Sequence, residues 1–167
     1  MKAKKQNFRD ELRDFTNRLC DLSFDRLNDF QRSQWMTRAY LELMLKVMNP
    51  GLIPEDIEDF DAAFTDGPSD GGVDFIARSE GHVLIIQSKY RKHGKDESEQ
   101  EFDYFCNVLT RLHPILGNSH KLSFKVREIA FDIDWEHDTF DLQFITLGKV
   151  GDNNEIRRSK LRGIRRG

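Results

Sequence analysis

The apolar positions in the first third of the chain predict two amphipathic helices. The first spans residues 7–20, where apolar side chains recur at steps of three and four: Phe8, Leu12, Phe15, Leu19 and Leu22. The second begins at Gln31 or Ser33, runs to Met48 and is ended by Asn49-Pro50-Gly51. Its apolar positions cover more than one face, so we expect it to be well buried.

The middle of the chain predicts a β-hairpin. Runs of β-branched and aromatic residues flank residues 79–82, a turn-like cluster in which Gly81 supplies any positive φ value. A turn centred between Glu80 and Gly81 pairs Ser79 with His82.

The same register places Asp74 opposite Gln87. Because side chains alternate between the two faces of a strand, Lys89 falls on the same face as Asp74 and Gln87. The opposite face then forms an apolar core face: Val73, Phe75, Ala77, Leu84 and Ile86.

The face that carries Asp74, Gln87 and Lys89, which we call the polar face, has two open interpretations. It is either solvent-exposed surface, with Asp74 and Lys89 as a diagonal ion pair worth a few tenths of a kcal/mol, or a functional site. Three apolar residues share this face and predict that something covers part of it: Ile76, Val83 and Ile85. The glycines at 71–72 lie opposite Lys89, where missing side chains would let a ligand or another backbone approach.

The remaining pattern predicts a strand at residues 62–65, a helix over 97–112 closed by Pro114, and a strand over 140–147. Residues 121–135 fit a helix or a strand, and we favour a helix. This order of elements predicts an α/β fold in which helices flank a mixed sheet. The last strand should lie parallel to the strand at residues 83–89, because a helical crossover separates them.

Composition favours a single folded domain over residues 1–150. The 167 residues include 38% hydrophobic residues and 13 Phe, enough for a core. The net charge of −3 gives no overall basic signature, so nucleic-acid binding must be argued from local patches. Residues 149–167 hold seven Lys or Arg and two acids, a net charge of +5, which leaves −8 for residues 1–148. We expect residues 151–167 to be a disordered basic tail, or a linker to a domain absent from this chain.

Cysteine usage and the N-terminus predict a cytoplasmic protein. Cys20 and Cys106 are far apart and have no metal-ligand spacing, so neither zinc nor a disulfide framework is indicated. The basic residues at 2–5 precede no apolar stretch of the kind a signal peptide has. No run approaches the roughly 18 apolar residues of a membrane span.

The residues Asp70-Gly-Gly-Val-Asp74, followed by Ile85-Ile-Gln87-Ser88-Lys89-Tyr90, carry a family resemblance. They resemble the PD-(D/E)xK nuclease superfamily in its Gln-x-Lys variant, and within it the Mrr-like restriction endonucleases. The fuller string looks most like the nuclease domain of abortive-infection phage-resistance (AIPR) proteins. The resemblance implies a restriction-endonuclease-like fold.

The resemblance also implies a Mg²⁺ site, for which Mn²⁺ could substitute. In this interpretation Asp74 anchors the ion, Gln87 offers its amide oxygen and Ser88 its backbone carbonyl. Lys89 orients the attacking water and offsets phosphate charge. Glu42 resembles the helical acid that completes the metal shell, although an exposed pair with Arg38 or Lys46 is an equally ordinary interpretation of this residue.

Asp70 is a second candidate for completing the shell, or a turn residue that caps the bend at Gly71-Gly72. Gln87 stands where an acid is commoner, and Gly72-Val73 precedes Asp74 where the superfamily's name expects Pro. Loss of one negative charge should weaken metal affinity unless Glu42 or Asp70 compensates.

The basic run after the hairpin is a candidate for phosphate contacts, although such a run is also typical of a solvated loop. The residues concerned are Lys89, Tyr90, Arg91, Lys92 and Lys95. The expected function is a Mg²⁺-dependent endonuclease that hydrolyses DNA in anti-phage defence. The alternatives are a binding or sensing module that keeps the fold without turnover, and an RNase. Nucleases that cut both strands often dimerise, so a homodimer stays open, as does a further C-terminal domain.

Overall fold

The computed structural model describes residues 2–45, 62–65, 71–79, 81–92, 95–117 and 121–148. Its elements in chain order are α1 (Lys2–Leu19), the 3₁₀ turn η1 (Phe24–Arg26), α2 (Asp29–Tyr40), the π-helix η2 (Leu41–Leu45), β1 (Phe75–Ser79), β2 (His82–Lys89), α5 (Glu99–Cys106), α6 (Val108–Leu112), α7 (Phe124–Asp132) and β3 (Thr139–Thr146). Three features predicted from the sequence lie outside the described residues: Asp70, the end of the second helix at residues 46–48, and the basic tail.

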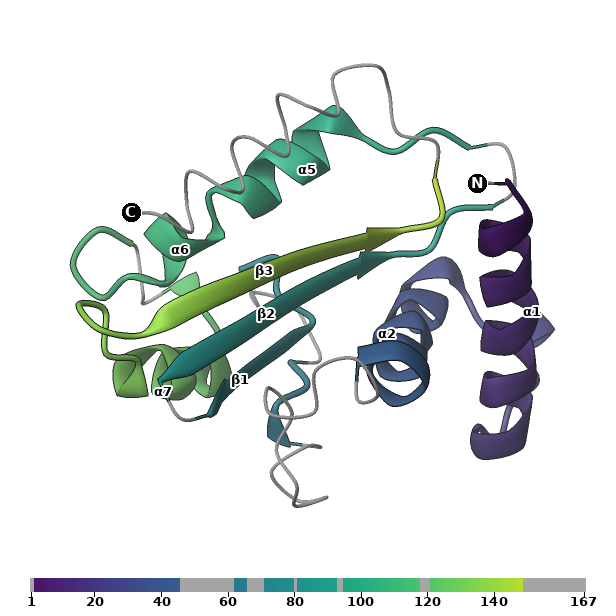
Figure 1. The fold of residues 1–167 in the computed structure, drawn as a ribbon, viewed down its shortest axis with the longest axis horizontal. Helices are drawn as coiled ribbons and strands as arrows, with labels where there is room; N and C mark the ends of the chain where they lie inside the picture. Colours follow the sequence, from purple (N-terminus) through teal and green to yellow (C-terminus); the bar gives the residue numbers. More distant parts are fainter. Residues whose placement is uncertain are drawn as a thin grey trace.

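The described strands form one mixed sheet in the order β1-β2-β3 (Figure 1). β1 and β2 are antiparallel, and Ser79 pairs with His82 as the turn chemistry predicts. Gly81 has a φ of 78°, a value that glycine adopts without the steric cost of a Cβ. β3 is parallel to β2, so the predicted crossover is confirmed. Helices on a mixed sheet confirm the α/β class.

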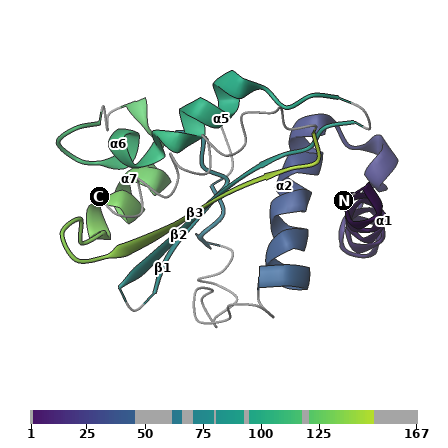
Figure 2. The ribbon, with the colours of Figure 1, turned by 45° about the horizontal axis from the view of Figure 1, so that its top comes forward.

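Helices cover both faces of this sheet (Figure 2). The helix formed by α2 and η2 packs on one face, and α1 lies outside α2. The cluster on this face contains Leu41, Leu45, Ala63, Phe64, Phe75, Ala77, Leu84 and Ile86. Residues of α5, α6 and α7 pack on the other face, against Ile76, Val83 and Ile85. The predicted cover over the polar face is therefore present.

Val73 departs from the predicted face. It packs with Ile76 in the cluster beneath α5, α6 and α7 rather than with Phe75. The strict alternation of side chains holds only inside a regular strand, and Val73 precedes the start of β1.

Several element boundaries also differ from the prediction. α1 begins at Lys2, five residues before the predicted start. The predicted helix over residues 97–112 breaks at Asn107, whose side chain donates to the carbonyl of Asp103 and so competes with the helical backbone. Residues 62–65 contribute only an isolated bridge between Phe64 and Phe75. The favoured helix at 121–135 is confirmed as α7, which Ser123 caps through the backbone N–H of Val126.

The loop before β3 is tied to β1 by Asp138. Its carboxylate accepts from Arg78 Nε at 2.5 Å and Nη2 at 2.9 Å, and from the backbone N–H of Asp134 at 3.0 Å. The hydrogen bond from Arg78 is the main cause that holds the pKa of Asp138 below its usual value. These hydrogen bonds join the C-terminal part of β1 to the loop that leads into β3.

We expect Asp138→Asn to lower the Tm by a few degrees at neutral pH. A carboxylate whose pKa is depressed in the folded state stabilises the fold above its unfolded pKa of about 3.9, and this contribution is lost as the pH falls through the lower folded value. The difference in Tm between wild type and variant should therefore shrink below about pH 4. Thermal unfolding monitored by circular dichroism over this pH range measures it, and a difference in Tm that is independent of pH would contradict the assigned role.

Candidate functional site

An open cleft of about 770 Å³ lies where β2 ends. Its lining combines residues of α2, the segment before β1, the end of β2 and α5: Asp29, Phe30, Ser33, Gly71, Gly72, Asp74, Gln87, Ser88, Lys89, Tyr90, Arg91, Gln100, Glu101 and Tyr104. The hairpin residues singled out by the sequence thus line one cleft.

Asp74 lies directly before β1 and continues its pairing with β2. Its backbone N–H donates to the carbonyl of Ile86 at 2.9 Å, and its Oδ2 accepts from the backbone N–H of Ser88 at 2.6 Å. The N–H and C=O of one strand residue point to the same side of the strand. The carbonyl of Ser88 therefore points to the same edge of β2 as the Asp74 carboxylate.

Gln87 is buried, with 6% of its surface exposed, and it lines the same cleft. Its Oε1 is inaccessible to solvent and has no hydrogen-bond partner among the described residues. A buried acceptor left unsatisfied costs about 1–3 kcal/mol. Of the metal ligands predicted from the sequence (Asp74, Gln87 and the Ser88 carbonyl), the Gln87 amide oxygen is therefore an acceptor that a donor or a cation would stabilise.

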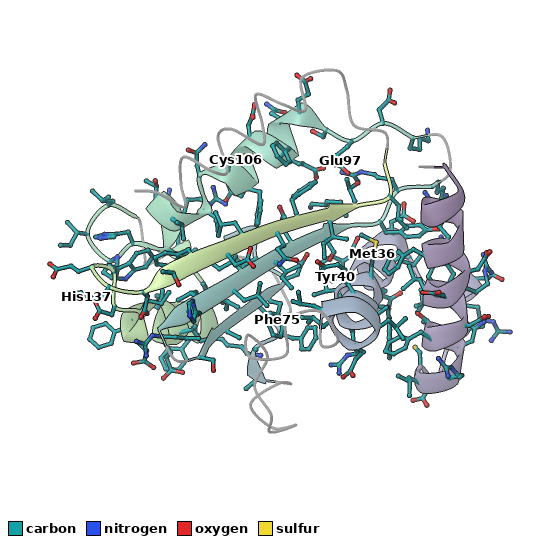
Figure 3. The ribbon with its side chains drawn as sticks, viewed as in Figure 1. Met36, Tyr40, Phe75, Glu97, Cys106 and His137 are labelled. Carbon is teal, nitrogen blue, oxygen red and sulfur yellow. The ribbon has the colours of Figure 1, made fainter. Side chains whose placement is uncertain are left out.

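Lys89 ends β2 with its side chain 26% exposed, and its Nζ lies 3.4 Å from Glu101 Oε1 of α5. The described contacts thus pair Lys89 with Glu101 and not with Asp74 as a surface diagonal. Glu101 also binds Arg91, which in turn holds Glu97 at 2.9 Å. Glu97 lies just before α5, and its Oε2 accepts from the hydroxyl of Thr146 at the end of β3 (Figure 3).

Glu42 is not brought to the cleft. α2 runs antiparallel to β2, as three contacts show: Ser33 Oγ accepts from the N–H of Tyr90 at 2.8 Å, Thr37 Oγ1 donates to Ser88 Oγ at 2.7 Å, and Leu41 packs further back along the strand. Glu42 therefore lies beyond the level of Ser88, on the helix that covers the face opposite Lys89.

The acid that α2 does bring to the cleft is Asp29, in its first turn. The sequence prediction missed it because helix direction relative to the sheet cannot be read from the apolar period. Asp29 lies 3.6 Å from Arg32, and its side chain is 56% exposed.

Two residues of the basic run line the cleft but are largely held by neighbouring side chains. The Tyr90 ring is 9% exposed and packs edge-on against Phe24. The Arg91 guanidinium is held by Glu97 and Glu101; burial acts to lower the pKa of Arg91, but the hydrogen bond and charge of Glu97 and the charge of Glu101 outweigh it and raise the value. Lys92 and Lys95 are exposed.

The space that the sequence predicts beside Gly71 and Gly72 is occupied by side chains of α5 and α6. Gly71 and Gly72 have φ values of 71° and 78°, and a Cβ on Gly72 would come within 2.9 Å of the Tyr104 ring. Arg111 of α6 donates from Nε and Nη2 to the carbonyl of Gly71, at 3.1 and 2.8 Å. These contacts fix the segment that leads into Asp74, and they involve residues about 40 positions apart.

No protein-family model, no curated protein and no solved structure matches this chain.

The cleft offers a limited set of oxygen ligands for a divalent cation. Within the described ranges, no three His, Cys, Asp or Glu side chains come close enough together to hold a metal ion. Mg²⁺ is commonly bound through one or two carboxylates and keeps several waters. One carboxylate from Asp74, the unsatisfied amide oxygen of Gln87 and the carbonyl of Ser88 fit that minimal pattern. Asp70, the other acid considered, lies outside the described residues.

In the part of the chain that the structure describes, no helix combines the length and the apolar character needed to cross a bilayer.

Proposed function

We propose that this chain is a metal-dependent endonuclease with a restriction-endonuclease-like fold, acting on DNA. One observation carries the proposal: Asp74, Gln87 and Lys89 line a single open cleft, and the buried amide oxygen of Gln87 has no hydrogen-bond partner among the described residues. The further assignment to anti-phage defence depends on the resemblance to AIPR nuclease domains alone.

Each chain residue has a distinct role in this proposal. Asp74, Gln87 and the Ser88 carbonyl would hold Mg²⁺, which when bound supplies a Lewis acid and lowers the pKa of a coordinated water. Lys89 would offset charge on the scissile phosphate and orient the attacking water. Glu101 positions Lys89 through their ion pair. The hydrogen bond from Ser88 N–H fixes the Asp74 carboxylate before any ligand arrives.

A second candidate function is a nucleic-acid-binding or sensing module that keeps the fold without turnover. The observation that favours it is the small charge of the described ligand set, in which Asp74 is the one carboxylate beside Gln87 and Ser88. Such a module would bind DNA in a salt-dependent way in EDTA and would cleave at no concentration of divalent ion.

Metal removal tests the two candidates directly. We expect the purified chain to nick supercoiled plasmid DNA in Mg²⁺ or Mn²⁺, to lose this activity completely in EDTA, and to regain it when Mg²⁺ is added back. Gel electrophoresis of a time course measures the rate, with RNA of matched sequence as a parallel substrate. Cleavage of RNA alone would assign an RNase, and cleavage that persists in EDTA would remove the metal from the proposal.

A further inference from the structure

A second hollow, of about 420 Å³, lies beside the cleft and is lined by cationic and aromatic residues. We call it the basic hollow, and its lining residues are Arg9, Asp10, Arg13, Phe24, Arg32, Tyr90 and Lys92. They come from α1, η1, α2 and the segment after β2. The sequence prediction included only Tyr90 and Lys92 of this set. The other lining residues are far from them in the sequence and reach the hollow only because α1, η1 and α2 pack against the segment after β2.

Two guanidinium groups of the basic hollow are held by neutral acceptors. Arg9 Nη2 donates to the carbonyls of Arg91 and Leu147, at 2.8 and 3.1 Å. Arg32 donates to the carbonyl of Phe24 from Nε and to that of Asp25 from Nη2, both at 3.2 Å. Carbonyl oxygens fix the orientation of a guanidinium without cancelling its charge.

The same two guanidinium groups lie over the Tyr90 ring. Arg9 Cζ is 5.6 Å and Arg32 Cζ is 5.3 Å from the ring centroid. Arg32 also lies 4.8 Å from the centroid of Phe24, and its side chain is only 14% exposed. The cations are therefore set in fixed positions on a buried aromatic platform rather than on freely moving stems.

The acids near the basic hollow neutralise it only in part. Asp25 pairs with Arg13 at 2.5 Å, Asp29 lies 3.6 Å from Arg32, and Asp10 is part of the lining. The first two acids are 73% and 56% exposed, so solvent screens them. Among the described residues, Arg9 and Lys92 have no carboxylate partner. Four cations against one acid in the lining favour an anionic ligand.

The basic hollow adjoins the cleft. Tyr90 lines both, and Arg32 precedes Ser33, which lines the cleft and accepts from the N–H of Tyr90. We propose that the basic hollow is a phosphate-binding subsite that holds the backbone of a nucleic-acid strand beside the cleft. The identity of the ligand depends on the proposed function, whereas the anion site itself is argued from the geometry of the cations.

Arg13 and Lys92 are the best positions for a test, because neither donates to the backbone carbonyls that fix Arg9 and Arg32 among the described residues. The protein is the full chain carrying Asp74→Asn, in EDTA, and the probe is a short fluorescein-labelled DNA duplex. We expect Arg13→Gln with Lys92→Gln to raise the Kd about tenfold at low salt. The slope of log K against log salt should fall by about one to two.

The matched control removes two exposed cations at the other end of the sheet, with Lys121→Gln and Arg127→Gln on and before α7 (Figure 1). It should leave the Kd and the salt slope near those of the parent. Equal values for both double variants would overturn the proposal. Loss of pyrophosphate binding in calorimetry without loss of DNA affinity would overturn the nucleic-acid assignment and indicate a free phosphate ligand.

Binding in EDTA separates this inference from the proposed nuclease activity. If the wild-type chain never cleaves but the Arg13 and Lys92 variant still loses DNA affinity, the nuclease proposal fails and the phosphate-binding subsite stands. If the wild-type chain cleaves DNA and the Arg13 and Lys92 variant keeps its DNA affinity, the nuclease proposal stands and the phosphate-binding subsite fails.

Discussion

Asp74→Asn is expected to lower the rate of plasmid cleavage in Mg²⁺ by at least ~10²-fold. Asparagine keeps the size of the side chain and an oxygen that can accept from the N–H of Ser88, but it removes the one carboxylate of the proposed ligand set. Metal-based stabilisation of developing charge is worth several kcal/mol, and each 1.4 kcal/mol corresponds to about tenfold in rate. Initial rates of nicking at saturating Mg²⁺ measure the effect.

Asp74→Ala provides the comparison that separates chemistry from folding. It removes both the charge and the acceptor of the Ser88 N–H, so we expect it to lose about 1–3 kcal/mol of unfolding free energy in addition to activity. Asp74→Asn should lose much less stability in urea unfolding. An Asp74→Asn protein that is folded and cleaves at the wild-type rate would refute the proposed metal site.

The hairpin could be predicted from the sequence because its information is local. Glycine at position 81 and the flanking β-branched residues determine both the turn and the pairing of Ser79 with His82. Extending that register by one residue beyond β1 predicts Asp74 near Gln87, and both residues line the cleft. The parallel placement of β3 followed equally from a general rule on crossovers.

The partners of the hairpin could not be predicted in the same way. Whether Glu42 or Asp29 reaches the end of β2 depends on the direction in which α2 crosses the sheet, because the two acids lie toward opposite ends of the helix formed by α2 and η2. The pairing of Lys89 with Glu101 joins residues on a strand and on a later helix. Nothing in the local sequence specifies it, because it arises from how α5 packs over the sheet.

Burial likewise separates residues that look alike in the sequence. Tyr90 and Lys92 belong to one basic run, yet the first is packed beneath Arg9 and Arg32 while the second is exposed. The difference arises because α1, η1 and α2 all pack against Tyr90. A run of basic residues therefore predicts charge in a region, but not which side chains present it to a ligand.

Lys89→Met is expected to lower the cleavage rate by ~10²- to 10⁴-fold, the range typical of a positioned group that acts on a proton or on a reacting phosphate. Methionine keeps most of the aliphatic stem, so the packing at the end of β2 should change little, while the ammonium is lost. Lys121→Met removes an equivalent charge from an exposed position near α7 and should retain the wild-type rate. Cleavage kinetics at saturating DNA and Mg²⁺ compare the two variants.

A variant of Glu101 offers the sharper control, because it distinguishes the effect of the Lys89 ammonium on the substrate from the effect of its ion pair with Glu101 on the fold. Glu101→Gln breaks the same 3.4 Å pair but leaves the ammonium in the cleft. If Lys89 acts on the substrate, Lys89→Met should be far more damaging to kcat than Glu101→Gln. If the two variants lose activity equally and show the same loss of Tm, Lys89 serves only to fasten α5 to the sheet, and its proposed role in phosphate chemistry is wrong.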